Sequence, residues 1–324
     1  MVFVYFQRSR VSRVEQLICK FEQLLYLLVI VPMIAFLPAP LAYGIACRRG
    51  DWAYRHDAST REEIMRNLES VIGDQMSDTE RAQVARGFFR RRSCEALDMM
   101  RLAGRGRWLA RLVEIRGLEH IEAALAAGKG AILCSAHYGF FNGCFSLLAA
   151  RGFPITVVGE QPSRSTSNMS LVERLFWRFG VEKRVARYRR RPNIEPGRGQ
   201  VEAAIQIVEI LRSNEVIGIA IDVSITQEER QRAVAVDFLG RQILLLPGSV
   251  TLAQMTGSQV LSLVVRRSSD WRHQSVEISP VPMNGDAESV FKRCVALVEA
   301  PIQQNPAYWN GWENSQNLDE LGLL

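Results

Sequence analysis

The sequence predicts an α/β fold in which helices flank a mostly parallel central sheet, preceded by a membrane-associated N-terminal helix. After residue 115, short apolar segments bounded by glycine or proline alternate with amphipathic segments of helical length, which is typical of strands joined by helices. The chain has 324 residues, 48% of them hydrophobic, enough to bury one substantial core. We expect residues 1–50 to form a membrane anchor or interfacial helix and residues 51–324 to form one domain.

An uncharged run near the N-terminus supports the first of these assignments. No charged residue occurs from Gln23 through Cys47, and basic residues flank the run on both sides. Its length would cross a bilayer. Three prolines interrupt a regular helix, so a kinked span and a shorter helix over 24–36 that lies in the interface both fit. A cleaved signal peptide is a further alternative, but no clear small-x-small cleavage site directly follows the run.

The rest of the chain divides into elements in a simple order. Residues 59–112 predict helix, because Ser59-Thr60 offers an N-cap before acidic residues and apolar residues then recur at helical spacing. The expected strands are Gly130–Ala136, Ile155–Val158, Val216–Ile221, Val234–Phe238 and Val260–Val265, with Val276–Ile278 as an antiparallel edge. The expected helices are Glu119–Ala127, Phe141–Arg151, Asn168–Phe179, Val201–Arg212, Gly248–Thr256 and Ala287–Gln303.

One histidine follows the first of these strands directly. The segment Ala131-Ile-Leu-Cys-Ser-Ala-His137-Tyr-Gly carries an apolar strand onto a glycine turn. Ligands of such sheets bind beyond the carboxyl ends of the strands, and an imidazole with a pKa near 6.5 accepts a proton readily at neutral pH. His137 therefore predicts a general base. The alternative is a histidine that serves only as a polar residue in the turn.

A histidine base works best with a carboxylate on its other nitrogen, which fixes the tautomer and stabilises the imidazolium. Five residues after His137 stands Asn142, expected on the first turn of the next helix, whose amide oxygen accepts a hydrogen bond but carries no charge. Two carboxylates follow other strands, Glu160 and Asp222. We expect Asp222 to be the compensating group, because it ends an apolar strand.

Three parts of the chain together resemble the late acyltransferases of lipid A biosynthesis and their phosphatidylinositol mannoside acyltransferase relatives. These parts are residues 115–142, residues 236–260 and the Asn305-Pro-Ala-Tyr-Trp309 segment. The resemblance covers roughly residues 20–312 and implies a glycerolipid acyltransferase-like fold, with an acyltransferase domain over 51–324. It also implies a His-x4-Asp/Glu motif in which Asn142 replaces the acidic residue, and an acidic residue at the position of Asp222.

The resemblance further implies residues that bind substrate. Gly240 would permit a tight turn that leaves Arg241 near the mouth of a pocket, and the amides of the helix that begins at Gly248 would face an anion. Glu160 joins them as an expected substrate-binding residue. Without the resemblance, the 236–249 segment predicts only a hairpin turn and a capped helix.

The implied activity is that of a membrane-associated O-acyltransferase, which moves a fatty acyl chain from acyl carrier protein or coenzyme A to a hydroxyl of a glycolipid or related amphiphile. The implied location is the inner (cytoplasmic) membrane, with the catalytic domain on the cytoplasmic side. Departures from the family occur at Asn142, at Gly159-Glu160-Gln161 in place of an arginine-proline pair, and after Trp312, where a His/Arg-rich stretch is absent. Two alternatives therefore stay open: an impaired relative that binds lipid or carrier protein without turnover, and an acyltransferase that acts on a secondary metabolite.

The charge distribution limits the expected partners, and the cysteine spacing indicates the redox state of the thiols. The formal charge is +6, and residues 164–198 hold ten Lys or Arg against three Glu, which suits a phospholipid surface, a phosphorylated substrate or an acidic carrier protein. The six cysteines form no C-x-x-C pair, which favours reduced thiols. Nucleotide, serine-hydrolase and zinc motifs are absent from the sequence. We expect no cofactor, no metal and no nucleic-acid partner.

Overall fold

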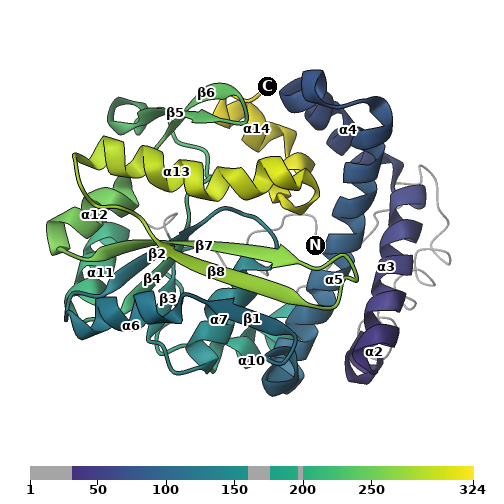
Figure 1. Cartoon of the computed structure of the whole chain (residues 1–324), viewed down its shortest axis with the longest axis horizontal. Coiled ribbons are helices and arrows are strands. Elements are labelled where there is room, and N and C mark those ends of the chain that lie inside the picture. Colours follow the sequence, from purple (N-terminus) through teal and green to yellow (C-terminus); the bar gives the residue numbers. More distant parts are fainter. Residues whose placement is uncertain (1–30, 160–175, 196–199) are drawn as a thin grey trace, which may run out of the picture.

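The computed structural model describes residues 31–159, 176–195 and 200–324. They form three layers, with a six-stranded sheet between two groups of helices (Figure 1). The strands lie in the order β1-β8-β7-β2-β4-β3. Their bounds are β1 Val113–Arg116, β2 Ala131–Ser135, β3 Ile155–Val157, β4 Val216–Ala220, β7 Gln259–Arg267 and β8 Gln274–Pro280.

Helices cover both faces of the sheet, which explains why its central strands are uninterrupted apolar runs. One face carries α11 (Gln200–Arg212), α12 (Gly248–Thr256) and α13 (Ala287–Gln304), and the other carries α6 (Leu118–Ala126) and α7 (Phe141–Ala150). Alternate residues of β2 enter the two cores, since Ile132 packs into the first and Leu133 into the second. The predicted helices at these five places are confirmed to within about a residue.

The sheet is mostly parallel, as predicted. Strands β7, β2, β4 and β3 run in one direction, and β8 runs antiparallel to β7. The expectation that 276–278 forms the edge is wrong, because β1 pairs in parallel with β8 and lies outside it. The sequence did not reveal β1, since this four-residue strand carries Glu114 and Arg116 and lacks an apolar run.

Residues 234–238 form a strand, but one that lies outside the central sheet. This strand, β5 (Val234–Phe238), pairs in an antiparallel hairpin with β6 (Arg241–Leu245). Leu239 and Gly240 make its two-residue turn with φ values of 52° and 77°, as the turn that matches strand twist requires. The hairpin packs on α13 (Figure 1), where the Leu239 amide donates to the buried Glu299 carboxylate at 2.7 Å.

The N-terminal half is helical. The helices are α2 (Val31–Phe36), α3 (Ala39–His56), α4 (Ala58–Ile72) and α5 (Asp78–Leu109), so the helical prediction over 59–112 corresponds to two helices. The break follows from a capping box, in which the Ser77 amide donates to Glu80 at 2.8 Å and the Glu80 amide donates back to the Ser77 hydroxyl at 3.4 Å. Gly50 lets α3 approach α5, since a Cβ there would lie 2.5 Å from Cα of Arg90.

Smaller elements complete the chain. They are η2 (Gly73–Gln75), η3 (Phe176–Glu182), α10 (Lys183–Ala186), η5 (Arg230–Arg232), η6 (Pro306–Tyr308), η7 (Asn310–Glu313) and α14 (Ser315–Leu321). The predicted helix Asn168–Phe179 and most of the predicted N-terminal anchor lie outside the described residues. Within the described part of the chain, no helix combines the length and the apolar character needed to cross a membrane.

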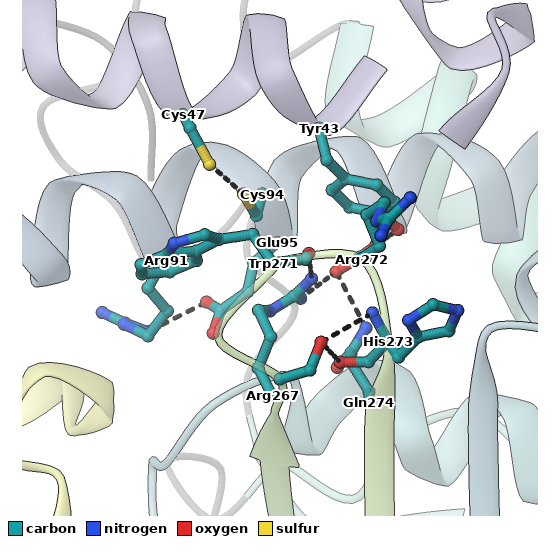
Figure 2. A network of polar contacts seen from close by, with 12 residues as sticks. Tyr43, Cys47, Arg91, Cys94, Glu95, Arg267, Trp271, Arg272, His273 and Gln274 are labelled. Carbon is teal, nitrogen blue, oxygen red and sulfur yellow. Dashed lines mark hydrogen bonds and ion pairs between the residues drawn. The ribbon is translucent and has the colours of Figure 1, made fainter. Parts of the chain in front are cut away.

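A buried ion pair ties the N-terminal helices to the sheet (Figure 2). The Asp98 carboxylate, on α5 and 0% exposed, accepts hydrogen bonds from the Tyr43 hydroxyl of α3, from Arg267 at the end of β7, and from the Gln274 amide at 3.0 Å. Burial disfavours the charged guanidinium, but the charge of Asp98 outweighs this, so the pKa of Arg267 is raised. Burial, together with Asp98, raises the pKa of Tyr43.

Asp98→Ala should destabilise the fold by about 3–5 kcal/mol, because it leaves a buried guanidinium without its carboxylate. Urea unfolding followed by circular dichroism measures the change. The matched control is Glu114→Ala, which removes an acid whose pair with Arg116 is solvent-exposed on both sides and should have no measurable effect. An Asp98→Ala protein as stable as the control would contradict this account of the buried pair.

Candidate active site

His137 and Asp222 meet because of the register between two neighbouring parallel strands. Ser135 of β2 pairs with Ala220 of β4, and each functional residue stands two positions beyond its strand. The His137 Nδ1 atom lies 2.9 Å from Asp222 Oδ1, and the His137 backbone amide donates to both carboxylate oxygens at 2.9 and 3.0 Å. One carboxylate therefore holds both the ring and the backbone of the histidine.

A tryptophan from the C-terminal segment forms a further hydrogen bond with this carboxylate. The Trp309 indole Nε1 donates to Asp222 Oδ2 at 2.7 Å, and both residues are buried. The same segment is fixed to the histidine loop through its backbone, since the Asn310 amide donates to the His137 carbonyl and the Gly139 amide to the Tyr308 carbonyl, both at 2.8 Å. The sequence marked this segment as family-like but gave no role to Trp309.

The charge of Asp222 favours the protonated form of His137. Burial favours the neutral imidazole, but the negative charge of Asp222 and its hydrogen bond outweigh burial, so the pKa of His137 is raised above its usual value of about 6.5. The His137 side chain is 39% exposed, whereas that of Asp222 is 3% exposed. Among the described residues, none forms a hydrogen bond with His137 Nε2. The ring thus leaves Nε2 without a hydrogen-bond partner among the described residues, while Nδ1 is held by Asp222.

Asn142 does not take the place of Asp222. It stands on the first turn of α7, as the spacing predicts, but its side chain is exposed and forms no hydrogen bond with another described residue. The neighbouring Phe141 ring instead packs edge-on against His137, with 5.0 Å between ring centroids. The Phe140 N-cap provides no side-chain hydrogen bond to the first amides of this helix.

Of the four expected substrate-binding residues, the structure describes Gly240, Arg241 and Gly248. Arg241 forms no described contact with His137. Its guanidinium donates to the Ser70 carbonyl at the end of α4. Glu160 lies outside the described residues. Gly248 is exposed at the first turn of α12. Since α12 leads through a short turn into the start of β7, its N-terminus points toward the carboxyl edge that carries His137.

Among the described residues of the basic segment 164–198, Arg189 lies against α7. Arg189 Nη2 donates to the Ser146 hydroxyl at 2.8 Å, and Nη1 donates to the Asn193 side chain. Burial lowers the pKa of Arg189 to about 10. Other basic residues of this segment, at 183, 184, 187 and 190, are exposed and form a positive surface suited to an anionic partner.

Comparison with known proteins identifies one family. The family model described as bacterial lipid A biosynthesis acyltransferase matches residues 17–312, nearly the whole chain. The search of curated proteins finds no match.

Asp222→Asn should lower the pKa of His137, because burial would then act without an opposing negative charge. An NMR titration of the four histidines, assigned with His137→Gln, measures this. In the wild type, the pair stabilises the fold below the unfolded-state pKa, and this contribution is lost as the pH rises through the higher folded-state value. The same midpoint in wild type and variant would contradict the pairing.

Proposed function

The chain belongs to the family of bacterial lipid A biosynthesis acyltransferases, and from this premise we propose a membrane-associated O-acyltransferase that moves a fatty acyl chain from acyl carrier protein or coenzyme A to a hydroxyl of a glycolipid or related amphiphile. The family makes the chain an acyltransferase that acts on a lipid-like substrate. The finer assignment rests on the His137–Asp222 pair, whose Nε2 atom is left for a substrate hydroxyl.

The pair suits base catalysis of acyl transfer. His137 Nε2 removes the proton of the acceptor hydroxyl as its oxygen attacks the thioester carbonyl carbon. The C–O bond forms, the C–S bond breaks, and the leaving thiolate receives the proton back from the imidazolium. Asp222 holds the Nδ1–H group and stabilises the transient positive charge, while Trp309 and the His137 amide keep the carboxylate in place.

The start of α7 supplies donors for the negative charge that develops on the thioester oxygen. Its first amides have no side-chain cap, and the Phe141 ring brings this helix end against His137. Backbone amides at a helix N-terminus favour an anion, and preorganised donors of this kind stabilise the oxyanion of acyl transfer. Asn142 keeps this helix end free of a second carboxylate. Roles for Glu160, Gly240, Arg241 and Gly248 in substrate binding stay predictions.

Membrane association is supported by an apolar face on the N-terminal helices. Leu41 and Ile45 of α3 and Met33 of α2 are exposed, and the exposed Arg48 follows on α3. An exposed apolar stripe beside an arginine suits an interface with anionic lipid. We infer that this face lies on the membrane. The location of the protein at the inner membrane, with the catalytic domain on the cytoplasmic side, stays a prediction.

The exposed amide of Asn142 also favours a second candidate, a relative that binds lipid or carrier protein without turnover. Under this second candidate, catalysis requires an acidic residue at position 142, which this chain lacks. Under the first candidate, Asp222 fulfils that role. An acyltransferase that acts on a secondary metabolite would share the His137 chemistry and differ in the acceptor alone. Mass spectrometry of lipids and small molecules from cells with and without the protein separates these acceptors.

We expect His137→Ala and Asp222→Asn each to reduce the rate of acyl transfer by about 10³- to 10⁴-fold, since the equivalent Asp to Asn change in serine proteases costs about 10⁴. Asn142→Asp, which adds charge at the same helix end, should change the rate less than about tenfold, because Asp222 already occupies Nδ1. Transfer of a radiolabelled acyl group from acyl carrier protein or coenzyme A to extracted lipid measures all three.

Two results would count against the proposal. Equal rates of acyl transfer by wild type and His137→Ala would show that His137 is not the general base. A wild-type protein without turnover that gains strong activity from Asn142→Asp would instead favour the impaired-relative candidate, held inactive by the missing charge.

Replacing Leu41 and Ile45 together by Asp should weaken binding to vesicles of anionic phospholipid at least about tenfold, because two apolar side chains no longer enter the interface. Cosedimentation of the full chain measures the partition. The chain offers a matched control in Val201 and Ile205, an exposed apolar pair with the same spacing on α11; their replacement by Asp should leave binding unchanged. Equal losses for both pairs would argue against a specific face.

A further inference from the structure

Two cysteines that the reaction at His137 does not use meet between α3 and α5. The Sγ atoms of Cys47 and Cys94 lie 3.8 Å apart, within hydrogen-bonding distance for sulfur (Figure 2). The two residues stand 47 positions apart in the sequence, so no local spacing pattern reveals the pair. The structure therefore holds a dithiol at the contact between the helix with the exposed apolar residues and the helix that carries Asp98.

Contacts on both sides of the pair fix the distance between the two helices. On α3, one turn before Cys47, the Tyr43 hydroxyl donates to Asp98. On α5, Asp98 stands one turn beyond Cys94. One turn after Cys47, Gly50 lets the backbones approach, since a Cβ there would lie 2.5 Å from a Cα atom of α5. An S–S bond is about 2.0 Å long, so the two sulfurs need to approach by about 1.8 Å to form one.

The two thiols differ in access and in acidity. Cys47 is partly exposed, whereas Cys94 is 0% exposed. The pKa of Cys47 is lowered, first by its hydrogen bond with Cys94. The positive charges of Arg90 and Arg267 lower this pKa further and, together with that bond, outweigh burial. The same hydrogen bond, with burial, raises the pKa of Cys94. Because the thiolate is the nucleophile, Cys47 is the thiol that reacts first with a reagent from solvent.

We propose that Cys47 is a modification site for a low-molecular-weight disulfide such as oxidised glutathione, and that Cys94 converts the adduct into a disulfide between α3 and α5. The Cys47 thiolate attacks one sulfur of the reagent, whose S–S bond breaks as a first thiolate leaves. Cys94 then attacks the Cys47 sulfur and releases a second thiolate. The two leaving thiolates take up the two cysteine protons, so one disulfide bond is reduced as another forms. An accessible thiolate beside a second cysteine is the arrangement of redox-sensing sites.

A second pair of cysteines provides a comparison within the same chain. Cys134 of β2 and Cys294 of α13 also share a hydrogen bond, but both are 0% exposed. Burial and that hydrogen bond raise the pKa of Cys294 well above its usual value. A reagent in solvent therefore meets neither an accessible sulfur nor a ready thiolate at this pair. Proximity alone does not make a reactive pair, and we expect only Cys47 and Cys94 to be oxidised.

The disulfide would act on the helix that carries the exposed apolar residues. Leu41 and Ile45 lie on α3, and in the reduced protein the described contacts between α3 and α5 are all non-covalent. A crosslink removes open states in which α3 separates from α5. The formation of the disulfide does not depend on the proposed acyl transfer. Only an effect on membrane contact rests on the proposed function.

Peptide mapping tests the chemistry on the full chain, with Cys19→Ser in the parent and in every variant because Cys19 lies outside the described residues. After treatment with oxidised glutathione and alkylation of the remaining thiols, mass spectrometry should find Cys47 crosslinked to Cys94. Cys94→Ser should stop at glutathione on Cys47, and Cys47→Ser should stay unmodified at Cys94. Cys294→Ser is the matched control and should form the same crosslink as the parent.

Hydrogen exchange followed by mass spectrometry measures the consequence for α3. Oxidation should slow the exchange of the α3 amides at least about tenfold in the parent and leave it unchanged in Cys47→Ser. The proposal is overturned by the absence of a Cys47–Cys94 crosslink in the parent, by a Cys134–Cys294 crosslink that forms as fast, or by equal exchange in the oxidised and reduced parent. None of these measurements needs acyl transfer, so an inactive enzyme would reject the proposed function and leave them unaffected.

Discussion

The candidate site depends on the register in which β2 pairs with β4. Parallel strands in register carry residues at equal distances beyond their ends to the same place, and this brings His137 next to Asp222. A shift of one residue would point one of the two side chains to the other face of the sheet. Trp309 and the backbone of η6 and η7 then close on a carboxylate whose position is already set. The C-terminal segment therefore stabilises the pair but does not define it.

A second constraint joins the N-terminal helices to the same edge. Asp98 holds Tyr43 of α3 and Arg267 at the end of β7, and Arg267 in turn holds the Trp271 carbonyl. A buried pair of this kind has little net value against an apolar replacement, but its loss is costly because the remaining charge stays buried. The helices with the exposed apolar face and the end of β7 are thus linked by one carboxylate.

Local patterns in the sequence were enough to predict the strands and helices whose type and boundaries depend on neighbouring residues alone. The run before His137, the helix from Gly248 and the helix from Ala287 are confirmed, since each carries its own periodicity and its own boundary residues. Strand order is not local. The place of the β5–β6 hairpin outside the central sheet and the outer position of β1 depend on contacts between distant segments, and the contact between Trp309 and Asp222 joins residues 87 positions apart. Arg241 had the expected turn beside it, but only tertiary packing directs it to Ser70.

In the proposed mechanism, Asn142 in place of the expected acidic residue changes the charge near His137 more than it changes the contacts of the histidine. The held nitrogen of His137 already faces Asp222, and the end of α7 faces the same ring. A carboxylate at position 142 would add a second negative charge at that helix end, where it would stabilise the imidazolium but oppose a developing oxyanion. With an amide there, the helix end keeps its full attraction for an anion, and a single carboxylate sets the basicity of His137. In the proposed mechanism, the asparagine therefore goes with a smaller rise in the pKa of His137 and with an oxyanion site that has no second carboxylate beside it.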